Sequence, residues 1–506
     1  MTQPLPAASL QAPHTVGARS EPPRLVVVGG RRKRGPLRPN KLVPARARIA
    51  PQAAARAFQA LDILVLTAIA AWAGAGAAGG SVLQAQIGHT LPFIVGAVGA
   101  AVALRAGDAY AYNRSERQAG HLLRVLAAFG AAGAAALAAS WAVDGGLSAA
   151  AVLVWTGSAT LLVCALHLWA YDLTRSWRRN GRMTPNLVFV GATPAAARLI
   201  EAALASREVA VLGVFDDRAA RAPETLHGVP VLGDVGALLD HRLLPYVDRI
   251  VITVTDAAEA RTRALVDRLR LLPNEVTLLL PGDGRALERI TDAPLHFVDG
   301  WRSDNSRAFG KRIQDLVLAG VGLVVALPVM AMVALAVRLD SPGPILFRQK
   351  RHGFNNEIIT VWKFRSMRVE ASDGQARRQV TANDDRVTRV GRFIRRTSLD
   401  ELPQIFNVLA GQMSVVGPRP HAIGMMTGER AASDLVAHYA HRHRIKPGIT
   451  GWAQINGSRG PVHTADAVAE RVALDVEYIE RRSLWLDLYI VAMTVPRLLG
   501  DRAAVR

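Results

Sequence analysis

Two adjacent acids, Asp400 and Glu401, lie in the stretch RRTSLDELPQIFNVLAG, which begins with Arg395. One interpretation is structural: Ser398 and Glu401 match an S-x-x-E capping box, and acids in a first turn favour the positive end of a helix dipole. The other interpretation is chemical, because a carboxylate beside arginines can attack phosphorus or bind magnesium next to phosphates. Taken alone, the stretch favours capping, so the choice depends on the rest of the chain.

Further cations have the spacing expected of a phosphate-binding site. In VWKFRSM, Lys363 and Arg365 would point to the same face of a strand, where two cations could hold a diphosphate. The alternative is a solvated edge strand, and the residues leave both open. In MSVVGPRPH, Pro418 and Pro420 stiffen the loop on both sides of Arg419, which suits phosphate recognition. These cations suggest an anionic substrate.

The segment HRHRIKPGITGWAQINGSRG combines histidines with glycines. Its glycines would allow a ligand to approach the backbone closely, and they are Gly448, Gly451, Gly457 and Gly460. His438, His441 and His443 could be metal ligands, but no cysteine or fourth partner has metal spacing, so a solvated helix face is favoured. Two further acids, Asp475 and Asp487, flank a candidate helix.

The 506-residue chain is too apolar for an ordinary soluble protein, and its charge suggests nucleic acid, an anionic membrane surface or anionic small substrates as partners. Half of the residues are hydrophobic, the net charge is +20 and the mean hydropathy is +0.17. Aromatic residues make up only 6% and do not interleave with a basic stripe, so we expect no nucleic acid partner. The single cysteine, Cys164, can form no internal disulfide. Residues 1–57 are predicted to be a basic, disordered cytoplasmic tail and not a signal peptide.

Residues 58–175 predict an N-terminal four-helix transmembrane bundle. The apolar stretches are residues 61–79, 91–104, 122–143 and 147–170. A spanning helix needs about 20 apolar residues, which the second stretch reaches only with its flanks. Basic residues lie between the second and third stretches and after the fourth, so both ends of the bundle should face the cytoplasm.

Residues 184–302 predict a Rossmann-like α/β domain, because strand and helix patterns alternate there. The turn after the first strand, NLVFV, keeps Gly191, but Thr193 and Ala196 replace the other fingerprint glycines. Asp216 is placed for a ribose contact. We favour a regulatory or assembly module over a bound nucleotide.

Residues 308–340 predict a re-entrant membrane helix. Its apolar part is long enough to span a bilayer, yet Lys311 and Arg338 flank it and Pro328 interrupts it. A helix kinked at Pro328 that enters and leaves on one face fits these charges better than a fifth span. Residues 341–506 would then form a C-terminal α/β catalytic domain on the cytoplasmic side.

From Phe309 to about Gly500 the chain resembles bacterial polyprenyl-phosphate sugar-1-phosphate transferases, in the large form with four N-terminal spans. The resemblance rests on KRIQDLVLA, LDSPGPILFRQKRHG, VWKFRSM, RVTRVGRFIRRTSLDELPQIFNVLAGQMSVVGPRPH and KPGITGWAQINGSRG. Members that transfer glucose-1-phosphate look most similar, notably through RTSLDELPQ and VGPRPHA. These motifs favour the chemical interpretation of the acid pair over the capping interpretation.

The resemblance implies a two-step reaction on the cytoplasmic face of the bacterial inner membrane. Asp400 would attack the β-phosphorus of a UDP-sugar and expel UMP, and undecaprenyl phosphate would then take the phosphosugar. Glu401 would bind Mg²⁺, and a helix starting near Asp400 would, with Arg395, keep that carboxylate ionised. The implied substrate-binding residues are Lys363, Arg365, Arg395, Arg419, Asp475 and Asp487, the last two without an assigned role. In smaller members a Ser-Pro pair forms the membrane kink, whereas here Leu327 precedes Pro328.

Other functions stay open beside this one. The donor could be UDP-galactose or a UDP-N-acetylhexosamine, or the chain could be an inactive membrane scaffold whose Rossmann-like domain senses a nucleotide. A nucleotide-sugar dehydratase or epimerase is disfavoured, because the α/β domain lacks both an intact glycine fingerprint and a Tyr-x-x-x-Lys pair. A homodimer is one option for the oligomeric state, which the sequence does not decide.

Overall fold

The computed structural model describes residues 42–77, 87–112, 116–143, 148–218, 222–253, 259–279, 295–299, 305–368, 384–427, 430–432, 435–436, 438–460, 462 and 464–500. Most of the predicted tail therefore lies outside the described residues. Within the described part of that tail, a short 3-10 helix η1 (Ala45–Ala47) is followed by a long helix that begins at Pro51.

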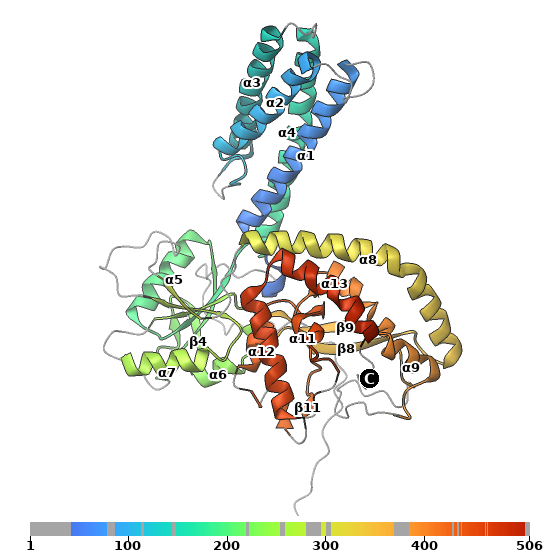
Figure 1. Cartoon of the computed structure of the whole chain (residues 1–506). Coiled ribbons are helices and arrows are strands. Elements are labelled where there is room, and N and C mark those ends of the chain that lie inside the picture. Colours follow the sequence, from blue (N-terminus) through green and yellow to red (C-terminus); the bar gives the residue numbers. More distant parts are fainter. Residues whose placement is uncertain are drawn as a thin grey trace, which may run out of the picture. The chain divides into compact units, whose positions relative to one another are not determined.

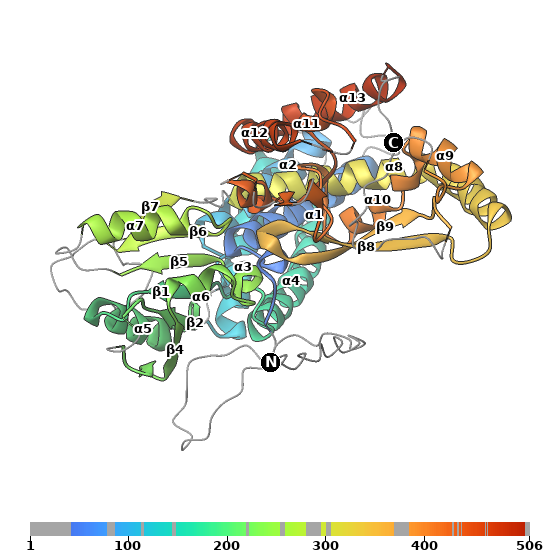
Figure 2. The same ribbon diagram turned by 90° about the horizontal axis from the view of Figure 1, so that it is seen from below.

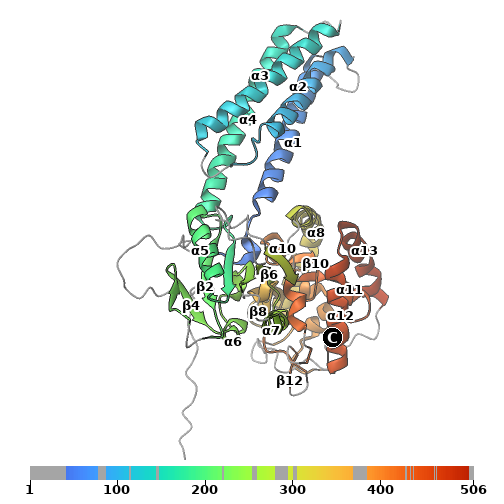
Figure 3. The ribbon, with the colours of Figure 1, turned by 90° about the vertical axis from the view of Figure 1, so that its left-hand side faces the viewer.

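Four long helices form the first part of the described chain. They are α1 (Pro51–Ala77), α2 (Ile87–Ala106), α3 (Gln118–Ala142) and α4 (Ala149–Arg179), and they lie side by side (Figure 3). Small residues allow close approach between them: a Cβ atom on Gly96 of α2 would lie 2.4 Å from the Trp155 ring of α4. Each predicted apolar stretch thus overlaps one helix.

A network of buried polar side chains crosses the core of these four helices. The Asp62 carboxylate accepts a hydrogen bond from the Tyr110 hydroxyl (2.7 Å) and lies 2.9 Å from Nε2 of His167. Nδ1 of His167 is 2.9 Å from Nε2 of His121, whose Nδ1 is 3.2 Å from Glu116. Buried ionisable groups lower the stability of the fold unless they are paired. This polar network therefore fixes the packing of α1, α3, α4 and the α2–α3 connection.

The α/β domain is built on a seven-stranded sheet with the order β3-β4-β2-β1-β5-β6-β7. The five central strands are parallel and the two edge strands are antiparallel to their neighbours. The strands are β1 (Asn186–Val190), β2 (Ala210–Phe215), β3 (Thr225–Leu226), β4 (Val229–Gly233), β5 (Arg249–Ile252), β6 (Glu275–Leu279) and β7 (Leu295–Asp299). The predicted alternation of strands and helices is confirmed.

Helices cover both faces of this sheet (Figure 2). They are α5 (Pro194–Ser206), α6 (Val235–Leu239), α7 (Glu259–Leu269) and the 3-10 helix η3 (Leu244–Tyr246). Side chains of β1 alternate between two cores: Leu187 and Phe189 pack with α5, while Val188 and Val190 pack with α6 and α7. This period of two is the one expected of a strand buried on both faces.

The turn after β1 contains a glycine with a positive φ and is hydrogen-bonded to a side chain at the end of β2. Gly191 has a φ of +105°, which other residues rarely adopt. The carboxylate of Asp216 accepts hydrogen bonds from the backbone N–H groups of Ala192 (2.7 Å) and Arg218 (2.8 Å). Asp216 therefore stabilises the turn in this structure.

The C-terminal part of the chain combines one long helix with short strands and helices (Figure 1). Its elements are α8 (Asn305–Asp340), β8 (Leu346–His352), η6 (Phe354–Asn356), β9 (Ile358–Phe364), α9 (Arg389–Arg396), η8 (Leu399–Glu401), α10 (Gln404–Leu409), β10 (Ser414–Val416), β11 (Met426–Thr427), β12 (Arg430–Ala431), η10 (Tyr439–Arg444), β13 (Gly448–Thr450), α11 (Trp452–Ile455), α12 (Ala465–Arg481) and α13 (Leu484–Gly500). Strands β8 and β9 pair antiparallel over their whole length and form a hairpin across residues 353–356.

Helix α8 is continuous through Pro328 and bends along its length (Figure 1). One face is buried: Met330, Val333 and Val337 pack with side chains of β9 and α9. Apolar side chains on its other face are uncovered in the described protein, and Val324 and Val325 are 75% and 71% exposed. Among the described residues, α1 to α4 and α8 are long and apolar enough to cross a membrane.

Candidate active site

The acid pair lies on η8, between α9 and α10, and the capping interpretation is wrong for this structure. Ser398 has a φ of +59°, and its side chain caps no backbone N–H of η8. Helix α10 begins at Gln404, with Pro403 at its N-cap, where the missing N–H of proline costs no helix bond. A single 3-10 turn, and not the start of an α-helix, therefore presents Asp400 and Glu401.

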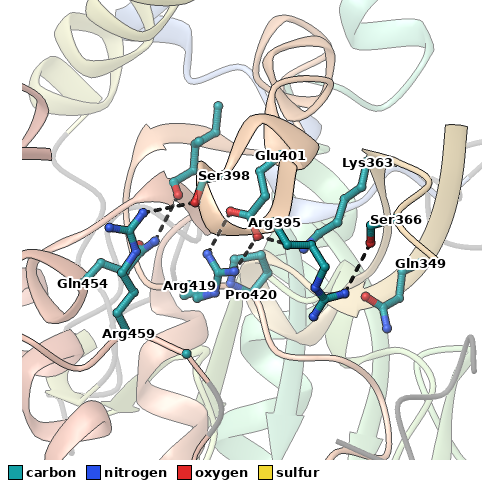
Figure 4. Close-up of polar contacts among 12 residues, drawn as sticks. Gln349, Lys363, Ser366, Arg395, Ser398, Glu401, Arg419, Pro420, Gln454 and Arg459 are labelled. Carbon is teal, nitrogen blue, oxygen red and sulfur yellow. Dashed lines mark hydrogen bonds and ion pairs between the residues drawn. The ribbon is translucent and has the colours of Figure 1, made fainter. Parts of the chain in front are cut away.

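Glu401 is held by two of the predicted cations. Nζ of Lys363, at the end of β9, lies 2.8 Å from its Oε1. The Arg419 guanidinium donates to both carboxylate oxygens, at 2.5 and 3.0 Å, which is a bidentate pairing. Figure 4 shows the three side chains converging from different elements. Lys363, Glu401 and Arg419, far apart in sequence, are therefore brought together as expected.

The two acids differ in their electrostatic surroundings although they are neighbours. Burial alone would raise the pKa of Glu401, but Arg419 and Lys363 outweigh it and hold that pKa well below its ordinary value. Burial raises the pKa of Asp400, which is 7% exposed, and the charge of Glu401 raises it further. Lys363, Arg395 and Arg419 offset this only in part. Arg395 thus favours the ionised form of Asp400, as expected, but it does not offset the burial of that carboxylate.

Two further arginines border the acid pair, and sequence reasoning singled out only one of them. Arg395 donates to the Ser366 hydroxyl at 3.3 Å and favours the ionised form of Asp400 (Figure 4). Arg351, on β8, donates to the backbone carbonyl of Pro420, next to Arg419. Burial and Arg419 lower the pKa of Arg351 to about 10, while both acids act in the opposite direction. The signal available in the sequence was its place in the quoted motif RQKRHG.

Arg365 does not join this group. Its guanidinium donates to the backbone carbonyls of Pro342 (2.5 Å), Ser341 (2.6 Å) and Val337 (3.3 Å), and the residue is 4% exposed. Strand β9 ends at Phe364, so alternation no longer governs the direction of Arg365. The predicted pairing of Lys363 and Arg365 on one face is therefore not formed; Arg365 instead caps the end of α8.

The two later acids lie in separate ion pairs. Asp475 on α12 is buried against Arg442, with 2.7 Å between Oδ2 and a guanidinium nitrogen. Asp487 on α13 lies 2.8 Å from Nζ of Lys311 on α8 and accepts a hydrogen bond from Tyr478 at 2.6 Å. Neither acid has a described hydrogen bond to Asp400 or Glu401.

The three histidines do not share the solvated helix face that the sequence suggested, because His443 is buried while His438 is exposed. His443 is buried, its Nδ1 contacts the amide oxygen of Asn356, and its ring stacks on His352 with 5.6 Å between centroids. The rings of His438 and His441 lie tilted against each other with 4.7 Å between centroids. The element is a 3-10 helix, in which a period of three replaces the α-helical period.

Two of the predicted ligand-approach glycines serve close backbone packing within the protein. A Cβ atom on Gly448 would lie 2.1 Å from the backbone nitrogen of Gly417, and one on Gly451 would lie 2.3 Å from its carbonyl oxygen. The approach follows from the parallel pairing of β10 with β13. These glycines hold the Arg419 loop against the segment after η10.

The protein side chains at the acid pair supply only part of the ligands that a magnesium ion needs. Among the residues that the structure describes, no group of three or more His, Cys, Asp or Glu side chains could hold a metal ion. Mg²⁺ is usually bound through one or two carboxylates together with substrate phosphates. The adjacent carboxylates of Asp400 and Glu401 fit that requirement.

Comparison with known proteins identifies two family matches in the chain. The bacterial sugar transferase family matches residues 306–501, and a CoA-binding domain family matches residues 105–279. The first match covers α8 and every residue of the acid-pair site.

Three curated relatives show how far the similarity extends. The chain is 41% identical over 288 residues to the UDP-glucose:undecaprenyl-phosphate glucose-1-phosphate transferase of Xanthomonas campestris, covering 56% of this chain and 59% of that protein. It is 52% identical over 194 residues to the undecaprenyl-phosphate glucose phosphotransferase of Komagataeibacter xylinus, covering 38% and 36%. It is 46% identical over 185 residues to the exopolysaccharide production protein PSS of Rhizobium leguminosarum, covering 37% and 92%. The chain thus spans less than two thirds of the first two relatives and nearly all of the third.

Proposed function

The chain belongs to the bacterial polyprenyl-phosphate sugar-1-phosphate transferases, and from this premise we propose that it transfers glucose-1-phosphate from UDP-glucose to undecaprenyl phosphate and releases UMP. The names of the Xanthomonas and Komagataeibacter relatives support the substrates. The observation that carries the proposal is the acid pair, in which Asp400 is buried and Glu401 is ion-paired to Lys363 and Arg419. The product would serve the first membrane step of exopolysaccharide or capsule synthesis.

In the first step an oxygen of the Asp400 carboxylate attacks the β-phosphorus of UDP-glucose. A phosphorus–oxygen bond forms to Asp400, and the bond from that phosphorus to the bridging oxygen breaks, so UMP leaves with the bridging oxygen. In the second step a phosphate oxygen of undecaprenyl phosphate attacks the same phosphorus and displaces the carboxylate. The products are UMP and the lipid diphosphate sugar, and Asp400 is regenerated without a net proton change.

The cations around the pair would bind the charged parts of both substrates. Arg419 and Lys363 now neutralise Glu401, and a bidentate guanidinium matches the geometry of phosphate oxygens. Arg395 precedes the acid pair in the sequence and favours the ionised form of Asp400. When the phosphates of the donor enter, these cations can move from the carboxylates to them, which leaves Asp400 in reach of the phosphorus.

The proposal includes Mg²⁺, which Glu401 together with Asp400 would hold. When bound, the metal offsets negative charge on the phosphates of the donor. The chain itself contributes the carboxylates and keeps Glu401 ionised, since the pKa of Glu401 lies well below its ordinary value.

We further propose that the protein lies in the bacterial inner membrane with its catalytic domain in the cytoplasm. Helices α1 to α4 would span the bilayer, and α8 would enter and leave on the cytoplasmic face. The apolar exposed face of α8 and its bend support this arrangement. Lys311 and Arg338, near its two ends, favour the same side of the membrane for both.

The experiment that tests the reaction is a single-turnover assay without the lipid acceptor. Detergent-purified protein with UDP-glucose and Mg²⁺ should release about one UMP per active site, and label from the glucose should stay on the protein. Asp400→Asn keeps the size of the side chain but removes its charge, so it should abolish both the burst and the label. The matched control is Asp385→Asn, which changes an exposed acid of the same domain and should leave both intact.

Two outcomes would contradict parts of the proposal. UMP that appears only with the lipid present, and no trapped label, would exclude the covalent intermediate. UMP release from UDP-galactose or a UDP-N-acetylhexosamine, and not from UDP-glucose, would change the sugar while leaving the reaction class.

A further inference from the structure

We propose that Arg442, paired with Asp475, is a positioning group that fixes the loop carrying Arg419 and so sets the place of the Arg419 guanidinium beside Glu401. This inference rests on the proposed function for its kinetic consequence. Its structural basis lies in the buried contacts behind the acid pair.

Arg442 is among the most deeply buried side chains of the described protein. It lies on η10, is 1% exposed, and points behind the loop that follows β10. One terminal nitrogen donates to the backbone carbonyl of Arg419 at 2.6 Å and lies 2.7 Å from Oδ2 of Asp475. The same nitrogen thus joins the Arg419 loop to α12.

The second terminal nitrogen of Arg442 contacts the ring of His421, two residues after Arg419. Nε2 of His421 lies 2.8 Å from it, and Nδ1 lies 2.5 Å from the hydroxyl of Tyr439. A guanidinium only donates, so the histidine nitrogen that accepts from it carries no proton. Arg442 therefore holds the Arg419 loop at two points, one on the backbone and one on a side chain.

Only an arginine with a buried anion can make this set of contacts. The planar guanidinium reaches a carbonyl, a carboxylate and an imidazole at once, which the single ammonium of lysine cannot match. The charges of Arg442 and Arg471 lie near each other and both lie near Asp475, whose negative charge offsets their repulsion. Asp475, which had no role from sequence, becomes the group that allows Arg442 to be buried.

Helix α12 fixes a second loop of the site in the same way. Arg471, one turn before Asp475, donates to the Ser458 hydroxyl and to the carbonyl of Gly460, both at 2.9 Å. The residue between them, Arg459, donates to the hydroxyl of Ser398 at 3.3 Å (Figure 4). One face of α12 thus supports two loops that contact the turn carrying the acid pair, the loop of Arg419 and the loop of Arg459.

A double-mutant cycle on the full chain tests the inference. Asp475→Asn should raise the donor KM about ten-fold with a smaller change in kcat, because a displaced Arg419 loses donor binding. In the Arg419→Ala background the same change should matter less than about two-fold, since both act through one group. Equal effects in both backgrounds would overturn the proposal. Arg386→Met, which removes another partly buried ion pair of the same domain, is the control for general damage and should show no such coupling.

A second measurement does not depend on transferase activity. Phenylglyoxal modifies accessible arginines, and peptide mass spectrometry gives the extent at each position. Asp475→Asn and Arg442→Met should each increase the modification of Arg419 several-fold relative to the exposed Arg348, because the loop is released from α12. Unchanged modification of Arg419 in both folded variants would overturn the inference. Should the unaltered protein release UMP from no UDP-sugar while Arg419 still responds, the proposed function would fail and the positioning role would stand.

Discussion

At the scale of single residues, Asp400 and Glu401 have different roles because their ion-pair and hydrogen-bond partners differ. Glu401 receives three charge-assisted hydrogen bonds from Lys363 and Arg419, so its pKa stays well below the ordinary value. Asp400 is buried without a described hydrogen-bond partner of its own, and its pKa is raised. A less solvated carboxylate is the better nucleophile once it is ionised, which fits Asp400 as the attacking group.

The pH dependence of the reaction should follow from this division. Attack requires the carboxylate of Asp400, so kcat/KM should fall as the pH drops through its raised pKa. Glu401→Gln removes the neighbouring negative charge and frees Lys363 and Arg419 to act on Asp400, which lowers the pKa of Asp400. The acid limb of the profile should therefore move to lower pH, on top of a severe loss of rate from impaired magnesium use.

The measurement is the pH profile of kcat/KM for the donor, for Glu401→Gln and for the unaltered protein. Glu470→Gln is a suitable control, because Glu470 is an exposed acid on α12 and its loss should leave the profile in place. An acid limb that moves to higher pH, or stays unchanged in Glu401→Gln, would show that another group titrates in that limb.

The residues also show where sequence reasoning ends. The acid pair, Lys363 and Arg419 could be predicted, because their types and motifs carry the chemistry directly. The place of Arg365 could not, since it depends on β9 ending at Phe364 and on free carbonyls at the end of α8. The role of Arg442 could not either, because a buried arginine in HRHR looks like a solvated charge run until its partner Asp475 is known.

At the scale of elements, the order of helices and strands could be read from the chain while several of their ends could not. The apolar stretches, the strands of the parallel sheet and the β8–β9 hairpin follow from hydrophobic period and length. The start of α1 at Pro51 and the 3-10 turn of η8 depend on local capping and backbone strain, which a period does not encode. The polar network that links Asp62 to Glu116 was not predicted, because the sequence does not show which isolated ionisable residues of the apolar stretches pair with each other.

Helix α8 gives a prediction about topology. Arg365 caps its C-terminal end with three hydrogen bonds to carbonyls, and Lys311 near its start pairs with Asp487. Both ends are thus tied to the catalytic domain, so both should lie on the cytoplasmic face. Single cysteines at Asn305 and at the exposed Lys350, in a Cys164→Ala background, should resist an impermeant thiol reagent in intact spheroplasts.

The control for that labelling is the same reagent after the membrane is made permeable, when both positions should react. Labelling of the Lys350 position alone in intact spheroplasts would mean that α8 crosses the membrane completely. The bend of α8 would then be a feature of a spanning helix and not of a re-entrant one.

At the scale of the whole molecule, the chain joins a catalytic part to segments that contribute no described partner to the acid pair. Within the residues that the structure describes, the hydrogen bonds and ion pairs of Glu401 and Arg419 all come from positions after 340. The Rhizobium relative is matched over 92% of its length by an alignment of only 185 residues. The catalytic part therefore occurs as nearly the whole of another protein.

This separation leads to a prediction for a truncated chain that starts at Ser306. It keeps α8 and all residues of the proposed site, so it should insert into membranes and retain measurable UMP release from UDP-glucose. We expect lower stability, because contacts made by the α/β domain are removed, and thermal unfolding of the detergent-solubilised chain measures this. The truncated Asp400→Asn variant is the matched control and should be inactive. A folded, membrane-inserted truncated chain without activity would show that the segments before Ser306 complete the site, since the geometry around Glu401 would then require a support that none of its described partners supplies.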